Sequence, residues 1–433
     1  MKKRFLVMAM AGLALVGCVS EDVADISQSK EEVKATKITF ESPVLYDNEN
    51  VSRANYHGEI GTISSGSSVR SYPSSEDFII YAVKYDASTN YPGWEDDNNN
   101  QVEYTLFNEE TVRYDGSLDG WVPTKTSGDD PYYYWPEGKQ LAYAACSPAD
   151  LEQEDNWDGR SYSETGLTLT DFKVPADAAN HFDLLFSKRH VDVTKEDMLM
   201  TADDYSGAPV VFQHALSSIH FSLANSSEST EIVLQKISLY GINDTGTFTE
   251  GIVENIIDNN SFEYNRAENG NVTPTWTIAT NATKLSKSDA YVAFDAGSNS
   301  GLTFPENPQF ISDLLLHADN QNAGTNHVLL VLPQTLTEDA KLRIDYEVKN
   351  GNNTTTAHKV VSLYGAKKWD PVSKQVTNED INNWEIGTKY TYRLVYSKGA
   401  AKKDKIYFSP SSDDWQDAGI AVIDLANAEN ATD

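Results

Sequence analysis

The residue with the clearest chemical role is Cys18. It ends the sequence Leu15-Val16-Gly17-Cys18, which follows a basic start and an apolar run over residues 5–16. This run is shorter than the roughly 20 residues that a membrane-crossing helix needs, so it indicates an export signal. Small residues before a cysteine are typical of a lipobox, in which a diacylglycerol alkylates the thiol. We expect residues 1–17 to be a lipoprotein signal peptide and Cys18 to carry the lipid. An ordinary secretory signal that contains a cysteine is the alternative.

Two histidines lie close together in an apolar stretch, residues 210–223. The apolar positions change phase in the middle of this stretch, which predicts a β-bulge near Ser217 and Ser218. The shift places His214 on the buried side of the strand and His220 on the opposite side. A shared metal ion is therefore not expected, and we predict that His214 is a core residue hydrogen-bonded to the backbone.

The chain lacks the other patterns that carry chemistry. It has no glycine-rich phosphate loop, no paired-cysteine metal spacing and no nucleophile elbow. Its 65 carboxylates are spread so widely that no catalytic pair stands out. We expect no enzymatic activity, no metal and no cofactor.

Sugar binding could use aromatic side chains, and the candidates for stacking on a sugar are Tyr91, Trp94 and Trp121. Strands also bury aromatic side chains in the core, which is the alternative for these three residues.

Charge and cysteine content restrict the partners and the means of stabilisation. The formal net charge of −31 repels nucleic acid and anionic headgroups, so neither is an expected partner. The chain has two cysteines, and lipidation of Cys18 leaves Cys146 without a disulfide partner. The exported protein must therefore be held together by its hydrophobic cores.

The elements that must position these residues are mainly β-strands. Residues 18–36 are polar and predict a flexible tether, and from Lys37 onward the dominant period is two. Half-buried strands are predicted around 342–348 and 390–396, and fully buried ones at 78–83, 141–146 and 328–332. One short helix is predicted over 307–319. Many short strands with few helices indicate β-sandwiches.

A polar stretch at 225–230 interrupts two strand-like runs and suggests a domain boundary. We place an N-terminal β-sandwich domain at 37–225 and a C-terminal one at 226–433.

Several short motifs resemble landmarks of the fimbrillins, the type V pilins of Bacteroidales. The resemblance implies an all-β fold of two tandem transthyretin-like Greek-key sandwiches. It also implies an outer-membrane, surface-exposed lipoprotein that becomes a pilus subunit and contributes to adhesion. The motifs are the stretch 210–223, Tyr132-Tyr133-Tyr134-Trp135-Pro136, Asp183-Leu184-Leu185, Gly246-Thr247-Phe248, Leu332-Pro333-Gln334-Thr335-Leu336, and Trp384 with Gly387 and Tyr390.

The resemblance further implies polymerisation by strand exchange after proteolysis. An arginine-specific or trypsin-like surface protease would remove the lipidated segment, and a strand of another pilin subunit would fill the open groove. Arg53 is the predicted cleavage residue, because it lies in a polar stretch after a strand-like run at 37–46. Arg70 is a second choice. Cleavage after Arg53 would remove Cys18 together with the strand that carries Ile38 and Phe40.

Near the other end, an apolar run at 419–425 is the candidate donor strand, with Ile420, Val422 and Leu425 as its apolar positions. It is equally well interpreted as the last strand of the second sandwich. For Ile406 and Phe408, a position in the last strands of the second sandwich is the favoured interpretation.

The alternatives for the whole protein are an anchor or tip accessory subunit of such a pilus, or a glycan-binding surface lipoprotein. The sequence identifies neither the host or bacterial surface ligand nor the sister subunits.

Overall fold

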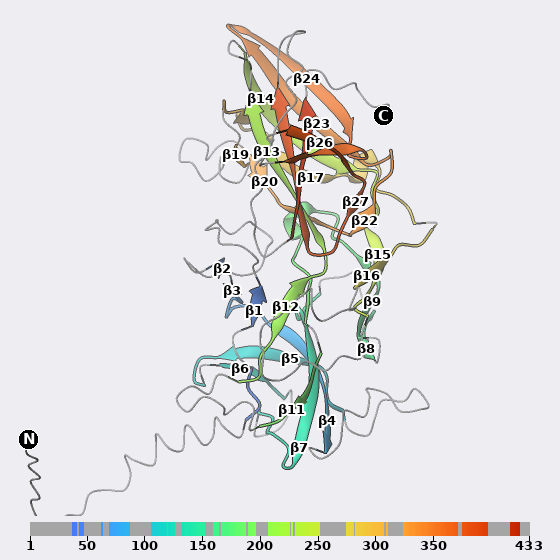
Figure 1. The fold of residues 1–433 in the computed structure, drawn as a ribbon. Coiled ribbons are helices and arrows are strands. Elements are labelled where there is room, and N and C mark those ends of the chain that lie inside the picture. The colour runs from blue at the N-terminus through green and yellow to red at the C-terminus, as the bar shows by residue number, and fades with distance from the viewer. Residues whose placement is uncertain are drawn as a thin grey trace, which may run out of the picture.

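The computed structural model describes parts of the chain between Lys37 and Asp424 (Figure 1). These parts consist of β-strands and two single-turn 3-10 helices, η1 (Ala178–Asn180) and η3 (Lys287–Asp289), so the predicted all-β fold is confirmed. The described residues are 37–40, 43–46, 62–63, 69–86, 105–118, 120–125, 131–151, 159–163, 166–187, 189–195, 207–225, 227, 230–251, 274–280, 282–306, 309–310, 324–370, 375–396 and 416–424.

The N-terminal half forms a ten-stranded sheet, the N-terminal sheet, in the order β2-β3-β1-β12-β10-β7-β4-β5-β6, with β11 also paired to β7. Its central strands β4 and β7 are buried on both faces, which explains the continuous apolar runs at 78–83 and 141–146. The members are β1 (Val44–Tyr46), β2 (Thr62–Ile63), β3 (Val69–Ser71), β4 (Phe78–Asp86), β5 (Thr105–Asp115), β6 (Gly120–Pro123), β7 (Lys139–Ser147), β10 (Leu185–Ser187), β11 (His190–Val193) and β12 (Val211–His214).

The C-terminal half contains two larger sheets whose inner faces share one hydrophobic core. One has seven strands: β13 (Ser217–Asn225), β19 (Gln309–Phe310), β21 (Leu329–Val331), β25 (Ala366–Asp370), β26 (Gln375–Ile381), β28 (Thr388–Tyr396) and β29 (Gln416–Asp424). The other has six: β14 (Glu231–Tyr240), β17 (Tyr291–Asp295), β18 (Leu302–Thr303), β20 (Thr325–Asn326), β23 (Lys341–Asn350) and β24 (Asn353–Ser362). A small pair of strands, β22 (Gln334–Thr335) and β27 (Asn383–Trp384), lies beside them.

A four-stranded sheet, the bridging sheet, combines strands from both halves of the chain. Its order is β16-β15-β9-β8, and its members are β8 (Arg160–Ser163), β9 (Gly166–Lys173), β15 (Thr245–Thr249) and β16 (Thr275–Thr277). In Figure 1 these strands run together along one side, between the end that holds β4 and β7 and the end that holds β14 and β24. Backbone hydrogen bonds between β9 and β15 thus tie the two halves together.

Strict alternation in the sequence corresponds to half-buried strands. In β23, Leu342, Ile344 and Tyr346 are buried, whereas the residues between them are half-buried.

The helix predicted over 307–319 is wrong at Gln309 and Phe310, which form β19 and pair with β13. A short apolar segment beside an open strand edge gains ladder hydrogen bonds that its local periodicity does not reveal. The rest of that segment lies outside the described residues.

The chain moves from the N-terminal sheet to the seven-stranded sheet within two residues, Ala215 and Leu216. The phase change that predicted a bulge near Ser217 is this change of sheet, because β13 pairs with β28 from Ser217 to Asn225 without a shift. The proposed boundary at 225/226 falls at the far end of β13, whereas the chain enters the C-terminal sheets at Ser217.

None of the helices in the described part of the chain is long and apolar enough to span a membrane.

Candidate functional site: the bound N-terminal segment and the C-terminal strand

Residues Lys37–Phe40, here called the N-terminal segment, lie between two other parts of the chain and pair with both through isolated β-bridges. The segment bridges β6 and residues 133–134 on one side and Ala208 on the other. Its backbone hydrogen bonds are Ile38 N–H to Tyr133 O (2.9 Å), Phe40 N–H to Trp121 O (2.7 Å), Trp121 N–H to Phe40 O (3.2 Å) and Ala208 N–H to Thr39 O (2.8 Å). The segment therefore binds through its backbone, as an added strand does.

The apolar side chains of the N-terminal segment complete the core of the N-terminal sheet. Ile38 and Phe40 are each 1% exposed. The Phe40 ring lies edge-on to Phe78 and Tyr143, with ring centres 6.2 and 5.5 Å apart. Burying two such side chains stabilises the fold by about 3–6 kcal/mol. Loss of the segment would expose this core to water.

Lys37 occupies a separate subsite at the start of the segment. Its side chain is buried, and its Nζ lies 3.4 Å from the centre of the Tyr132 ring. The Tyr132 hydroxyl donates to Asp115 Oδ2 at 2.7 Å. Burial opposes ionisation of Asp115, but hydrogen bonds from Ser117 and Tyr132 hold its pKa below the ordinary value. The ring and the nearby carboxylate together suit a cationic side chain.

The chain continues from the N-terminal segment into the middle of the sheet. β1 pairs in parallel with β12, Val44 opposite Val211, and antiparallel with β3. Cys18 and Arg53, the predicted lipidation and cleavage residues, lie outside the described residues. Arg70, the second choice for cleavage, lies in β3, whose backbone is paired with both β1 and β2. A backbone paired on both sides is a poor protease substrate, which favours Arg53 of the two.

The candidate donor strand corresponds to β29. It lies between β28, to which it is parallel, and β25, to which it is antiparallel. Ile420 is opposite Thr391, and Val422 is opposite Arg393. Leu425, Ile406 and Phe408 lie outside the described residues. In the single chain both edges of β29 are occupied, so it would have to leave this sheet to act in another subunit.

The structure gives each of the two histidines a side-chain partner. His214 is buried, but its Nδ1 lies 2.8 Å from Asp183 Oδ1, so the predicted backbone partner is wrong. Asp183 precedes β10, which pairs with β12, and this pairing brings the two side chains together. His220 Nε2 lies 2.7 Å from Ser218 Oγ. No cluster of three potential metal ligands occurs among the described residues.

One of the aromatic residues suggested for sugar stacking is not accessible. Trp121 is 2% exposed and packs against Tyr72 and Phe78, with ring centres 5.2 and 5.6 Å apart. Strand β6 turns this ring into the core, as alternation allows. Tyr91 and Trp94 lie outside the described residues.

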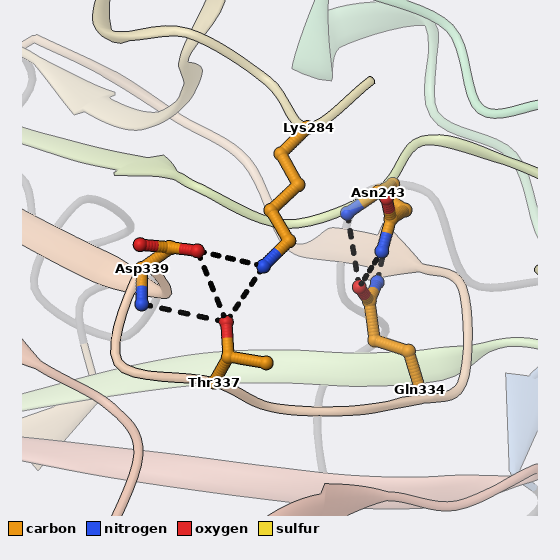
Figure 2. A network of polar contacts seen from close by, with 5 residues as sticks. All are labelled: Asn243, Lys284, Gln334, Thr337 and Asp339. Carbon is orange, nitrogen blue, oxygen red and sulfur yellow. Dashed lines mark hydrogen bonds and ion pairs between the residues drawn. The ribbon is translucent and has the colours of Figure 1, made fainter. Parts of the chain in front are cut away.

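Side chains reinforce the joint between the two halves. Trp276 Nε1 donates to the carbonyl of Ala215 at 2.7 Å, in the link between β12 and β13. Figure 2 shows Gln334 beside Asn243: its Oε1 accepts from the Asn243 backbone N–H at 2.9 Å and side-chain Nδ2 at 3.2 Å, and its Nε2 donates back to the Asn243 carbonyl at 3.0 Å. These contacts fix the turn from which β15 enters the bridging sheet.

The same network contains an ion pair. Lys284 Nζ donates to Asp339 Oδ2 at 2.8 Å and to Thr337 Oγ1 at 2.7 Å (Figure 2). The Lys284 hydrogen bond and charge hold the pKa of Asp339 below its ordinary value. The side chains of Lys284 and Asp339 are both accessible to water. The ion pair therefore orients these side chains more than it stabilises the fold.

Sequence reasoning identified Ile38 and Phe40 but missed Lys37, Tyr132 and Asp183. The signals were present, since Tyr132 and Asp183 belong to motifs noted above. Their partners are distant in sequence, however, and only the strand pairings reveal them.

Solved structures similar to this chain include candidate cell adhesion proteins from two Bacteroides species. The Bacteroides uniformis protein is 14% identical, with a TM-score of 0.38 over 88% of this chain and 98% of that one. The Bacteroides ovatus protein is 12% identical, with a TM-score of 0.36 over 83% and 92%. The tip fimbrial protein Mfa3 from Porphyromonas gingivalis is 10% identical, with a TM-score of 0.23 over 73% and 88%.

No curated protein matches the chain. The fimbrillin-like family model matches residues 91–415, about three quarters of the sequence, and includes most of the strands described above. The chain therefore belongs to the fimbrillin-like family.

Proposed function

We propose that this protein is a structural subunit of a cell-surface pilus, polymerised by proteolysis-triggered strand exchange and contributing to adhesion. The subunit is exported as a lipoprotein and held on the outer membrane through Cys18. A surface protease cuts after Arg53, and the released subunit joins a head-to-tail fimbrium with other pilin subunits. The observation that carries the proposal is the N-terminal segment, a buried stretch of chain bound by backbone hydrogen bonds and two apolar side chains.

Tethering explains why proteolysis would be the trigger. Before the cut, the N-terminal segment belongs to the same chain as its groove, so its effective concentration there is high and a second chain competes poorly. A cut after Arg53 separates residues 37–46 from the rest of the domain. The segment is then held only by noncovalent contacts, and a strand from another subunit replaces it with equivalent hydrogen bonds.

The contact formed in this way joins two different surfaces, the groove of one subunit and a strand of the next. Such a heterologous contact does not close on itself and therefore gives a filament. The run with Ile420, Val422 and Leu425 is the first candidate for the incoming strand. A subunit that keeps Cys18 and is not cut would instead be an anchor or accessory subunit.

The test is to incubate the precursor with an arginine-specific protease and to examine the products for a ladder of SDS-resistant polymers. We expect a ladder from the wild type and none from Arg53→Ala, with Arg70→Ala as the matched control that still polymerises. Clean trimming of the wild type without polymers would exclude strand exchange. A normal ladder from Arg53→Ala would exclude this cleavage site.

A further inference from the structure

The groove around the N-terminal segment selects side chains at three positions. It places a lysine over the Tyr132 ring and buries the side chains of Ile38 and Phe40. Thr39 is also buried, but its Oγ1 has no hydrogen-bond partner in the described part of the chain, so the groove makes no polar contact with this side chain. The groove therefore recognises the pattern Lys-Ile-x-Phe.

The same pattern occurs once more near the other end of the chain. Residues 37–40 read Lys-Ile-Thr-Phe, and residues 405–408 read Lys-Ile-Tyr-Phe. A Ser-Pro pair follows both, after one further residue in the first case (Glu41, then Ser42-Pro43) and directly in the second (Ser409-Pro410). The second copy therefore offers the same cation and the same two apolar side chains in the same order.

The third position differs in size, because Thr39 is fully buried and Tyr407 is the larger side chain, so the groove has to widen here. Gly120 lies beside Thr39, where an added Cβ would be 3.9 Å from the Thr39 Cβ. On the other side Gly207 has a φ of +104°, and its backbone approaches the Thr39 backbone so closely that an added Cβ would lie 2.8 Å from Thr39 O. Two glycines thus flank this position, and neither adds side-chain bulk that would oppose Tyr407.

The apolar run at 419–425 fits the groove less well. Residues 416–433 contain no lysine or arginine, so no cation from this run can take the place of Lys37. In addition, β29 already has paired strands on both edges. Burial of an apolar residue against Tyr132 would lose the cation–π contact, and burial of an acidic one would also bring a second carboxylate near Asp115.

We infer that residues 405–408 of a second copy of this chain occupy the groove that Lys37–Phe40 leaves, with Lys405 over Tyr132. This assignment rests on the proposed function, since it names the strand that the exchange delivers. It makes Tyr132 a specificity-determining residue and moves the donor segment upstream of β29.

The test uses the full chain cut after Arg53 and fluorescein-labelled peptides, with anisotropy as the measurement. The probe is a peptide of residues 402–411, and peptides of residues 35–44 and 416–425 serve as references. We expect the 402–411 and 35–44 peptides to bind and to compete with each other, and the 416–425 peptide not to compete. Lys405→Ala in the probe should weaken binding about five- to tenfold, as loss of a buried cation–π contact does.

A protein variant, Tyr132→Leu, separates recognition from folding, since its thermal unfolding can be checked independently. On this variant, Lys405→Ala in the peptide should no longer weaken binding. The Ile406→Asp and Phe408→Asp peptides should still fail to bind. Binding of the 35–44 peptide without the 402–411 peptide would overturn this inference and leave strand exchange intact. Binding of neither peptide would overturn both.

Discussion

At the scale of single residues, two buried histidines near the joint are stabilised in different ways. His214 faces the carboxylate of Asp183 at 2.8 Å. The hydrogen bonds of His181 go to the backbone: its Nε2 donates to Pro175 O at 3.0 Å, and its Nδ1 accepts the N–H of Leu330 at 3.2 Å. The arrangement predicted for His214, a core histidine bonded to the backbone, is thus found at His181. A ring that accepts an N–H must be neutral, because protonation removes the acceptor.

His181 gives the fold a defined acid sensitivity. Burial lowers its pKa to about 4, against a weaker opposing effect of the Pro175 carbonyl. Between pH 6.5 and 4 the unfolded chain binds a proton at this site and the folded chain does not. The contribution of neutral His181 to the free energy of unfolding is therefore fully present above pH 6.5. About 3 kcal/mol of this contribution is lost as the pH falls to 4. We expect urea unfolding to show this loss.

His181→Gln supplies the control, because an amide can accept from Leu330 and donate to Pro175 without titrating. Its free energy of unfolding should fall less steeply over the same pH range. An unchanged slope would mean that other groups cause the acid sensitivity.

At the scale of elements, the turn after β14 is fixed by a close backbone approach. Gly241 has a φ of +76°, and a Cβ added to it would lie 1.8 Å from Asp339 O. The Gln334 contact with Asn243 joins the same two segments, and Lys284 ties Asp339 to a third one (Figure 2). The turn therefore depends on a residue without a side chain at this position.

Gly241→Ala should be strongly destabilising. The left-handed φ alone costs about 1 kcal/mol, and displacement of the Asp339 backbone adds at least about 2 kcal/mol. Gly351→Ala is the matched control, because Gly351 also has a positive φ, +58°, and no atom within 4 Å of the added Cβ. Urea unfolding of both variants measures the difference. Equal losses of stability would show that the close approach at Gly241 is unimportant.

Strands in which apolar and polar residues alternate strictly could be predicted from the sequence. The partner strands with which they pair could not. The period of two in 342–348 describes β23 correctly, because burial on one face leaves a local trace. The strand at Gln309 and Phe310 and the pairing of β9 with β15 depend on residues far away in sequence. For the same reason Ile38 and Phe40 were identified as strand residues, while the Tyr132 subsite for Lys37 was not.

At the scale of the whole molecule, the two halves share one core. A single hydrophobic cluster extends from Ile79 and Phe172 to Leu342 and Leu394, and the bridging sheet adds backbone hydrogen bonds across the same joint. The Trp276 ring packs on Phe172 and Phe248, with ring centres 5.6 and 5.3 Å apart. A pulling force between the groove near Phe40 and the C-terminal sheets must therefore pass through this joint.

This shared core predicts that the two halves unfold together. In the wild type, near-UV and far-UV circular dichroism should give one coincident urea transition, which is the test of cooperative unfolding. Trp276→Ala removes the aromatic contacts and the hydrogen bond to Ala215, so we expect two separated transitions and a loss of about 3 kcal/mol. Tyr364→Ala, at an exposed site outside the joint, should keep the single transition. Two transitions in the wild type would mean that the bridging sheet does not couple the halves, and that a pulling force would unfold each half independently.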